Sequence, residues 1–137
     1  MYCFDTDVLL ATMRREPSLA LVRRLAVVPP DRQHTTAVTV GELLYGAARS
    51  GRPDLANRVL TLLDEALTVL PFDGAAAGVY GPLRAELARS GRPLAEPDLR
   101  IAAIAIAHDL TLVTGNGRHL ARVPGLRVEN WLAAVPS

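Results

Sequence analysis

The chain has 137 residues and half of them are apolar, so it is long enough for one domain with one sizeable core. Fifteen arginines nearly balance fourteen acidic side chains, which excludes a bulk attraction to phosphate or to a membrane surface. Lysine is absent and Cys3 is the lone cysteine, so phosphate-loop lysine, Schiff-base and internal disulfide chemistry are excluded. We expect a cytoplasmic protein with no membrane-spanning segment.

The first half of the chain alternates between short apolar runs and helical spacing. Residues 1–4 form an apolar run that ends at Asp5 and predicts a buried strand. Helical spacing follows over residues 8–15 and again over residues 17–25, where Pro29 and Pro30 end it. Residues 35–38 predict a second short strand, which leads directly into a helix over residues 39–50.

The second half continues this alternation. A helix is predicted over residues 54–66, a buried strand over 67–70, and a long helix up to Arg89 that Asp73 can cap. Gly81-Pro82 predicts a kink or a local break in that helix. The remaining expected elements are a helix over 99–108, with Pro97 in its first turn, and strands over 111–114 and 127–129.

This alternation predicts an α/β fold, in which helices flank a mainly parallel sheet of four or five strands. No composition shift or linker divides the chain. We therefore expect one domain over residues 1–134, followed by a short tail over residues 135–137.

Acidic and amide side chains follow the predicted strands, where parallel sheets bind their ligands. Asp5 and Asp7 end the first strand, and Glu42 lies in the first turn after the second. Asp98 opens the helix that leads to the strand at 111–114, and Asn116 follows that strand. Oxygen ligands of this kind suit Mg²⁺ or Mn²⁺, so the sequence predicts a divalent cation site.

Simpler structural roles remain open for several of these residues. Asp7 can cap the first helix, Glu42 and Asp98 can each be ordinary acids near a helix start, and Glu96 can cap a helix or face the same cleft. A carboxylate such as Asp5 at the end of a buried strand needs a partner or a metal. The three histidines show no metal-ligand spacing, although His119 lies close to Asn116.

Five segments, in this order and spacing, resemble the PIN-domain toxins of the VapC type. The matching segments are residues 4–7, 39–46, 97–103, 112–120 and 124–131. The resemblance spans nearly the whole chain and implies a single PIN-like domain. It also implies a ribonuclease toxin that a cognate antitoxin inhibits and that assembles as a homodimer.

The resemblance implies that Asp5, Glu42 and Asp98 are the acidic catalytic residues, with Asn116 where many PIN nucleases carry a fourth acid. We expect Asp5 and Asp98 to hold the principal Mg²⁺, and Glu42 to complete its shell through water or to position the attacking water. Asp7 stands where the family commonly has asparagine.

Attack by water on an RNA phosphodiester would leave a 5′-phosphate and a 3′-hydroxyl. Arg100 and Arg118, beside two of the site segments, are predicted to hold flanking phosphates, with surface ion pairing as the alternative. Two other functions compete with this one. A haloacid-dehalogenase-like phosphatase also begins with an Asp-x-Asp strand end but ordinarily uses a lysine, and a metal-free module would bind RNA or protein without turnover.

Overall fold

The computed structural model describes residues 1–132, so the predicted tail and the boundary at residue 134 lie outside the described residues. Five strands form one sheet: β1 (Tyr2–Phe4), β2 (Gln33–Thr36), β3 (Thr68–Leu70), β4 (Thr111–Val113) and β5 (Arg127–Glu129). The helices are α1 (Thr6–Thr12), α2 (Leu19–Ala26), the 3-10 helix η1 (Pro30–Arg32), α3 (Ala37–Ser50), α4 (Pro53–Ala66), α5 (Gly74–Arg89), α6 (Glu96–Ala107) and α7 (Gly117–Leu120).

All neighbouring strands run parallel, in the order β3-β2-β1-β4-β5. The chain builds the sheet outward from β1 in one direction up to β3, and then in the other direction through β4 and β5. The order therefore reverses between β1 and β4, where Tyr2 lies opposite Thr111. In sheets of this type the carboxyl ends on either side of such a reversal frame the ligand site.

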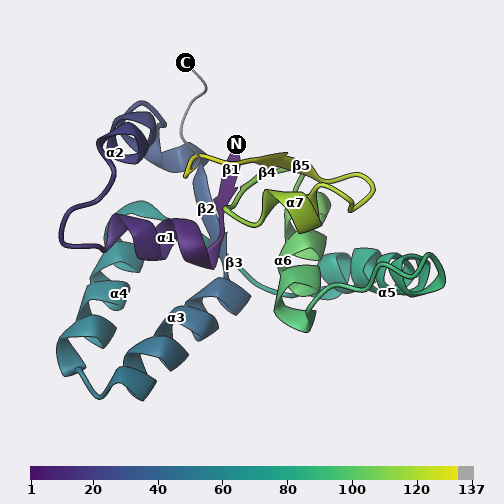
Figure 1. Cartoon of the computed structure of the whole chain (residues 1–137), viewed down its shortest axis with the longest axis horizontal. Helices are drawn as coiled ribbons and strands as arrows, with labels where there is room; N and C mark the ends of the chain where they lie inside the picture. The colour runs from purple at the N-terminus through teal and green to yellow at the C-terminus, as the bar shows by residue number, and fades with distance from the viewer. Residues whose placement is uncertain (133–137) are drawn as a thin grey trace.

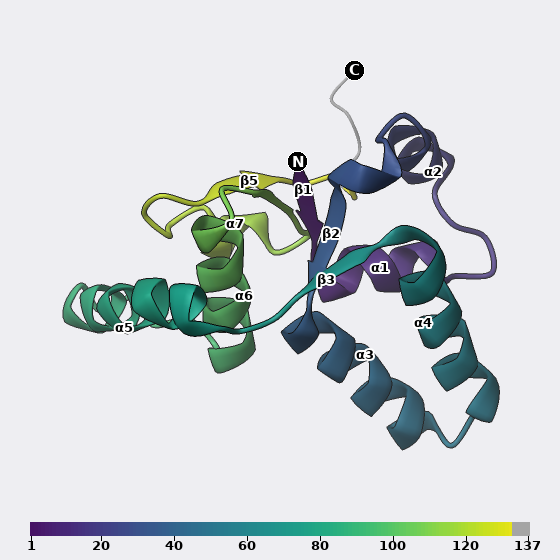
Figure 2. The same cartoon turned by 180° about the vertical axis from the view of Figure 1, so that it is seen from behind.

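Helices cover both faces of this sheet, as Figures 1 and 2 show. On one face α1 to α4 enclose a core that includes Phe4, Leu21 and Val113. On the other face α5 and α6 pack together over Cys3 and Leu112. Successive residues of β1 and β4 thus face opposite layers, and burial on both faces explains why these strands read as continuous apolar runs.

The predicted α/β fold with a parallel sheet is confirmed, with differences at element boundaries. The second strand ends at Thr36 rather than at residue 38, because the Thr36 hydroxyl accepts a hydrogen bond from Thr39 N (3.0 Å) and starts α3 at Ala37. The strand predicted to be buried at 67–70 is largely exposed, since β3 is an edge strand in which Val69 is 40% exposed.

Of the kink or local break predicted at Gly81-Pro82, the break is wrong, because α5 continues unbroken from Gly74 to Arg89. Proline removes one backbone donor inside this helix. Leu83 directly follows Pro82, Leu87 lies one turn later, and both are buried in the core that α6 shares. Tertiary packing therefore keeps the chain helical at Pro82.

Candidate functional site

Asp5 lies at the point where the strand order reverses. Its side chain is only 5% exposed. One carboxylate oxygen, Oδ1, accepts a hydrogen bond from Thr6 N (2.7 Å), which makes Asp5 the N-cap of α1. The other, Oδ2, accepts a hydrogen bond from the buried Thr114 hydroxyl (2.7 Å), which follows β4. Asp5 is therefore fixed from both strands that frame the reversal.

Glu42 reaches the same edge of the sheet from α3. Its Oε1 accepts a hydrogen bond from the Thr6 hydroxyl (2.8 Å), which ties α3 to the start of α1. Glu42 was predicted in the first turn of its helix, and this prediction is wrong. Because α3 begins at Ala37, Glu42 lies in the second turn. Glu42 is therefore further along the helix from the end of β2 than expected, but its side chain still contacts Thr6, which follows Asp5.

Asp98 and Asn116 meet from opposite sides of the site. Asp98 lies in the first turn of α6, as predicted, and its Oδ2 accepts a hydrogen bond from Asn116 Nδ2 (3.3 Å). Asn116 Oδ1 in turn lies 2.8 Å from His119 Nδ1. The backbone N–H of Asn116 donates to the Thr114 hydroxyl (3.0 Å), so the hydroxyl that holds Asp5 also holds the Asn116 loop.

Asp7 lies against the loop after β4 and does not cap α1. Its Oδ2 accepts a hydrogen bond from Gly115 N (2.8 Å), while Oδ1 is buried and has no hydrogen-bond partner among residues 1–132. A Cβ at position 115 would lie 2.5 Å from Asp7 Oδ2 and 3.0 Å from Leu132 Cδ1. Glycine is therefore required at position 115 for the carboxylate to approach the loop backbone this closely.

The carboxylates of this cluster repel one another. Burial, and next the charge of Asp5, raise the pKa of Asp7 above its ordinary value. Burial, followed by the charges of Asp5, Glu42 and Asp7, raises the pKa of Asp98. The acids that form ion pairs within residues 1–132 all lie outside the cluster, at positions 54, 96, 109 and 129. The cluster thus concentrates negative charge without an arginine to balance it.

This donor set fits a hard divalent cation. All the candidate ligand atoms are oxygens, one of them is a buried carboxylate oxygen without a hydrogen-bond partner among residues 1–132, and none of these acids forms an ion pair within that range. Among residues 1–132, no group of three or more His, Cys, Asp or Glu side chains is placed so that it could hold a metal ion in this arrangement. The carboxylates are neighbours whose oxygens suit a cation by their chemistry, and the hydrogen bonds described above fix their positions.

The structure does not bring Arg100 to the carboxylates. Arg100 Nε donates to Glu96 Oε1 (3.3 Å), and its guanidinium carbon lies 5.6 Å from the centroid of the Phe72 ring. Glu96 also accepts a hydrogen bond from the Tyr80 hydroxyl, so it leans away from the cleft. Arg118 is exposed on α7 and does not line the cavity beside Asp98.

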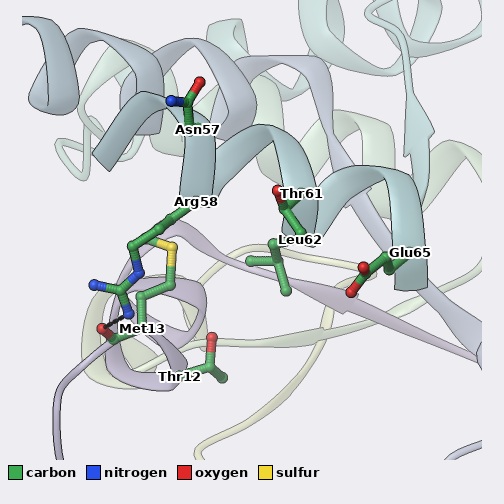
Figure 3. A pocket seen from close by; sticks show the side chains of 7 residues that line it. All are labelled: Thr12, Met13, Asn57, Arg58, Thr61, Leu62 and Glu65. Atoms are coloured by element: carbon green, nitrogen blue, oxygen red, sulfur yellow. Dashed lines mark hydrogen bonds between the residues drawn. The ribbon is translucent and has the colours of Figure 1, made fainter. Parts of the chain in front are cut away.

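Two cavities flank the carboxylates. One, of about 260 Å³, lies beside Asp98 and is also lined by Asn116. The other, of about 210 Å³, lies beside Glu42 and is lined mainly by apolar side chains of α1, α3 and α4. A larger cavity of about 410 Å³ lies between the end of α1 and α4, where Arg58 donates to the carbonyl of Met13 (Figure 3). None of the predicted site residues lines this larger cavity.

The sequence analysis did not single out the two threonines that position the acids. Thr6 donates to Glu42, and Thr114 donates to Asp5. Each follows a strand end, since Thr6 comes directly after Asp5 at the end of β1 and Thr114 comes directly after β4. A threonine directly after a strand end was therefore the sequence signal that could have indicated these two positioning residues.

Fold and site together define a parallel-sheet α/β protein with an acidic centre at the strand reversal. Residues 2–126 match the family model of the PIN domain. The tRNA(fMet)-specific endonuclease VapC of Shigella flexneri is 38% identical over 130 residues, which cover 95% of this chain and 97% of that protein. The chain belongs to the PIN domain family and, within it, to the VapC proteins.

Solved structures agree with this assignment. The DNA-bound VapBC structure from Salmonella typhimurium contains a chain that is 35% identical with a TM-score of 0.86, covering 95% of this chain and 97% of that one. A chain of VapBC-5 from Mycobacterium tuberculosis, a member of the VapBC family of toxin-antitoxin systems, is 31% identical with a TM-score of 0.65, covering 93% and 94%. Within residues 1–132, no helix is both long and apolar enough to cross a membrane.

Proposed function

We propose that this protein is a divalent-cation-dependent endoribonuclease and the toxin of a toxin-antitoxin pair. The observation that carries the proposal is the set of four carboxylates at the strand reversal, none of which forms an ion pair within the described residues. Family membership supports the same conclusion, since the Shigella flexneri relative is named an endonuclease. The absence of lysine and the PIN domain match remove support for the phosphatase alternative.

In this proposal Asp5 and Asp98 hold Mg²⁺ or Mn²⁺, and Asp7 adds negative charge beside them. A bound divalent cation neutralises charge on a phosphodiester and makes water more acidic. Thr6 fixes one oxygen of Glu42, which leaves the other oxygen to accept a proton from the attacking water. Asn116 holds Asp98 in place. Water attack would leave a 5′-phosphate and a 3′-hydroxyl on the two RNA fragments.

Two relatives are named for initiator tRNA, so that RNA is the first substrate to test. We expect the purified protein, with Mg²⁺ or Mn²⁺, to cut an initiator tRNA transcript. Asp5→Asn and Asp98→Ala should abolish cleavage, because each removes a charged oxygen ligand. Both variants should fold, since Asp5→Asn barely changes the side-chain volume and Asp98 is half-exposed. Cleavage by both variants at the wild-type rate would contradict the site assignment.

Asp109→Asn is the matched control. Asp109 lies just beyond α6, in a turn with φ 54°, and pairs with Arg127 on the protein surface. Asparagine tolerates the left-handed backbone of that turn and removes the same charge as the test variants. Cleavage should be unchanged in Asp109→Asn. RNA binding without cleavage by the wild-type protein would instead favour the metal-free module.

The antitoxin partner is expected on the apolar cavity beside Glu42. Leu10 lines this cavity and is 49% exposed, and Tyr45 on α3 is 65% exposed, whereas Leu9 and Leu43 belong to the core. Such exposed apolar side chains are typical of a surface that another chain covers. Co-expression with the protein encoded beside this one should yield a complex without nuclease activity. Light scattering of the free toxin tests the predicted homodimer.

A further inference from the structure

The cavity beside Asp98 has a chemistry that the carboxylate cluster does not explain. One wall is the segment between α5 and α6, where Pro93 and Leu94 present apolar surface. The opposite wall comes from α7 and the residues after it, with His119 and Arg122. Asp98 lies between these walls. We refer to this cavity as the His119–Arg122 pocket.

The hydrogen bonds of Asn116 determine which ring nitrogen of His119 is a donor. The Asn116 amide donates to Asp98 through Nδ2, so its Oδ1 is the acceptor that faces His119 Nδ1 (2.8 Å). His119 Nδ1 must therefore carry the proton, and the second ring nitrogen, Nε2, is left for another partner. A chain of side-chain contacts thus links the imidazole of the pocket to Asp98.

The inner guanidinium nitrogen of Arg122 anchors its side chain. Its Nε donates to the carbonyl of His119 (3.1 Å), and among residues 1–132 its guanidinium forms no ion pair with an acid. Within the part of the chain that the structure describes, no hydrogen bond occupies the two outer nitrogens, and their fork suits a phosphate. This differs from Arg100, whose guanidinium is occupied by Glu96 and by aromatic rings.

An apolar wall, an imidazole and an available guanidinium are the features that recognise a nucleotide. Bases of single-stranded RNA pack on apolar and ring surfaces, and arginine holds the adjoining phosphate. A volume of about 260 Å³ is suited to one nucleotide rather than to a longer segment. A second metal ion fits poorly here, since the pocket supplies one carboxylate and a cationic side chain.

We propose that the His119–Arg122 pocket binds one nucleotide of the RNA next to the cleaved phosphodiester, with its phosphate on Arg122 and its base between His119 and the Pro93-Leu94 wall. This inference rests on the proposed ribonuclease function and adds the residues that position its substrate. His119 and Arg122 are positioning residues for the RNA. They also place the strand of RNA on the Asp98 side of the site, opposite the apolar cavity beside Glu42.

The test uses a fluorescein-labelled initiator tRNA transcript with the inactive Asp5→Asn protein, and the same tRNA in cleavage assays with the active protein. Arg122→Gln should weaken binding about tenfold and lower the dependence of affinity on salt by about one phosphate contact. His119→Ala should weaken binding about fivefold. Arg122→Lys should recover most of the loss caused by Arg122→Gln. The matched controls, Arg23→Gln and His108→Ala, change exposed residues on α2 and just beyond the C-terminal end of α6, and both variants should bind RNA normally.

An abasic scan of the RNA supplies a second measurement. Removing the base at one position beside the cleavage site should slow cleavage by the wild-type protein about fivefold and should slow the His119→Ala protein no further. Normal binding and cleavage by Arg122→Gln and His119→Ala, together with loss of cleavage in Asp98→Ala, would overturn the pocket and leave the ribonuclease intact. A wild-type protein that neither binds nor cuts RNA would overturn both.

Discussion

Replacing Thr114 with valine tests whether a single hydroxyl holds the two halves of the site together. The Thr114 hydroxyl donates to Asp5 Oδ2 (2.7 Å) and accepts from Asn116 N (3.0 Å), and the side chain is fully buried. Valine has the same shape without either bond, so the variant leaves a buried carboxylate oxygen and a backbone N–H without their partners.

The expected cost follows from these two bonds. A hydrogen bond to a charged group contributes about 1.5–3 kcal/mol, and the bond to the Asn116 backbone contributes about 1 kcal/mol. The new buried methyl group returns about 0.8 kcal/mol. Thr114→Val should therefore lower the free energy of unfolding by about 2–3 kcal/mol, which at this chain length is a decrease in Tm of about 10 °C. Activity should fall about 10- to 100-fold, because Asp5 loses the group that orients it.

Thr111→Val, at the start of β4, is the control. The Thr111 hydroxyl is only half-buried and accepts a single long bond from Arg127 Nε (3.4 Å). Its replacement adds the same β-branched side chain to β4 and should change stability by less than about 0.5 kcal/mol. Circular dichroism melts in the presence of a chelator compare the two variants without any contribution from a bound cation. Equal melting temperatures for Thr114→Val and Thr111→Val would refute the reasoning.

Three further predictions concern the pH dependence of stability, the ends of the RNA fragments and the surface that binds the antitoxin. Because the pKa of Asp98 is raised, its protonated form favours the folded state, and this contribution is lost as the pH rises from about 3.8 through the raised pKa. The metal-free protein should accordingly lose stability over that range, and melts of Asp98→Asn should depend less on pH; parallel curves would contradict this. The downstream RNA fragment should carry a 5′-phosphate and ligate without kinase treatment, whereas a 2′,3′-cyclic phosphate on the upstream fragment would show attack by the ribose. Leu10→Arg combined with Tyr45→Arg should reduce copurification of the antitoxin at least tenfold while RNA cleavage persists; unchanged copurification would place the partner elsewhere.

Asp5 and Asn116 were predictable as candidate site residues because both follow the ends of strands. Asp5 directly follows β1, and Asn116 lies three residues beyond β4, so an apolar run followed by a polar residue located both. Parallel strands bring their carboxyl ends to one edge, and that rule alone brings distant segments of the chain together. Asp98 was predictable from the helix start that Pro97 marks.

Side-chain partners were not predictable, since they depend on tertiary distances. Arg100 was expected at the substrate because it stands two residues after Asp98. In a helix, two residues correspond to about 200° of rotation, and Arg100 accordingly meets Glu96 and Phe72 on another face. His119 and Arg122 lie farther along the chain, yet α7 returns them to the cavity beside Asp98.

The arrangement of charge around the site favours different surfaces for the RNA substrate and for the inhibiting antitoxin. The carboxylates lie between a cavity with an available guanidinium beside Asp98 and an apolar cavity beside Glu42. RNA is a polyanion and is attracted only to the first cavity, while a protein partner gains most from covering apolar surface at the second. A partner on the Glu42 side can therefore reach the carboxylates without competing for Arg122. Inhibition would then act on the reacting centre, and the RNA-positioning residues would stay free of the antitoxin.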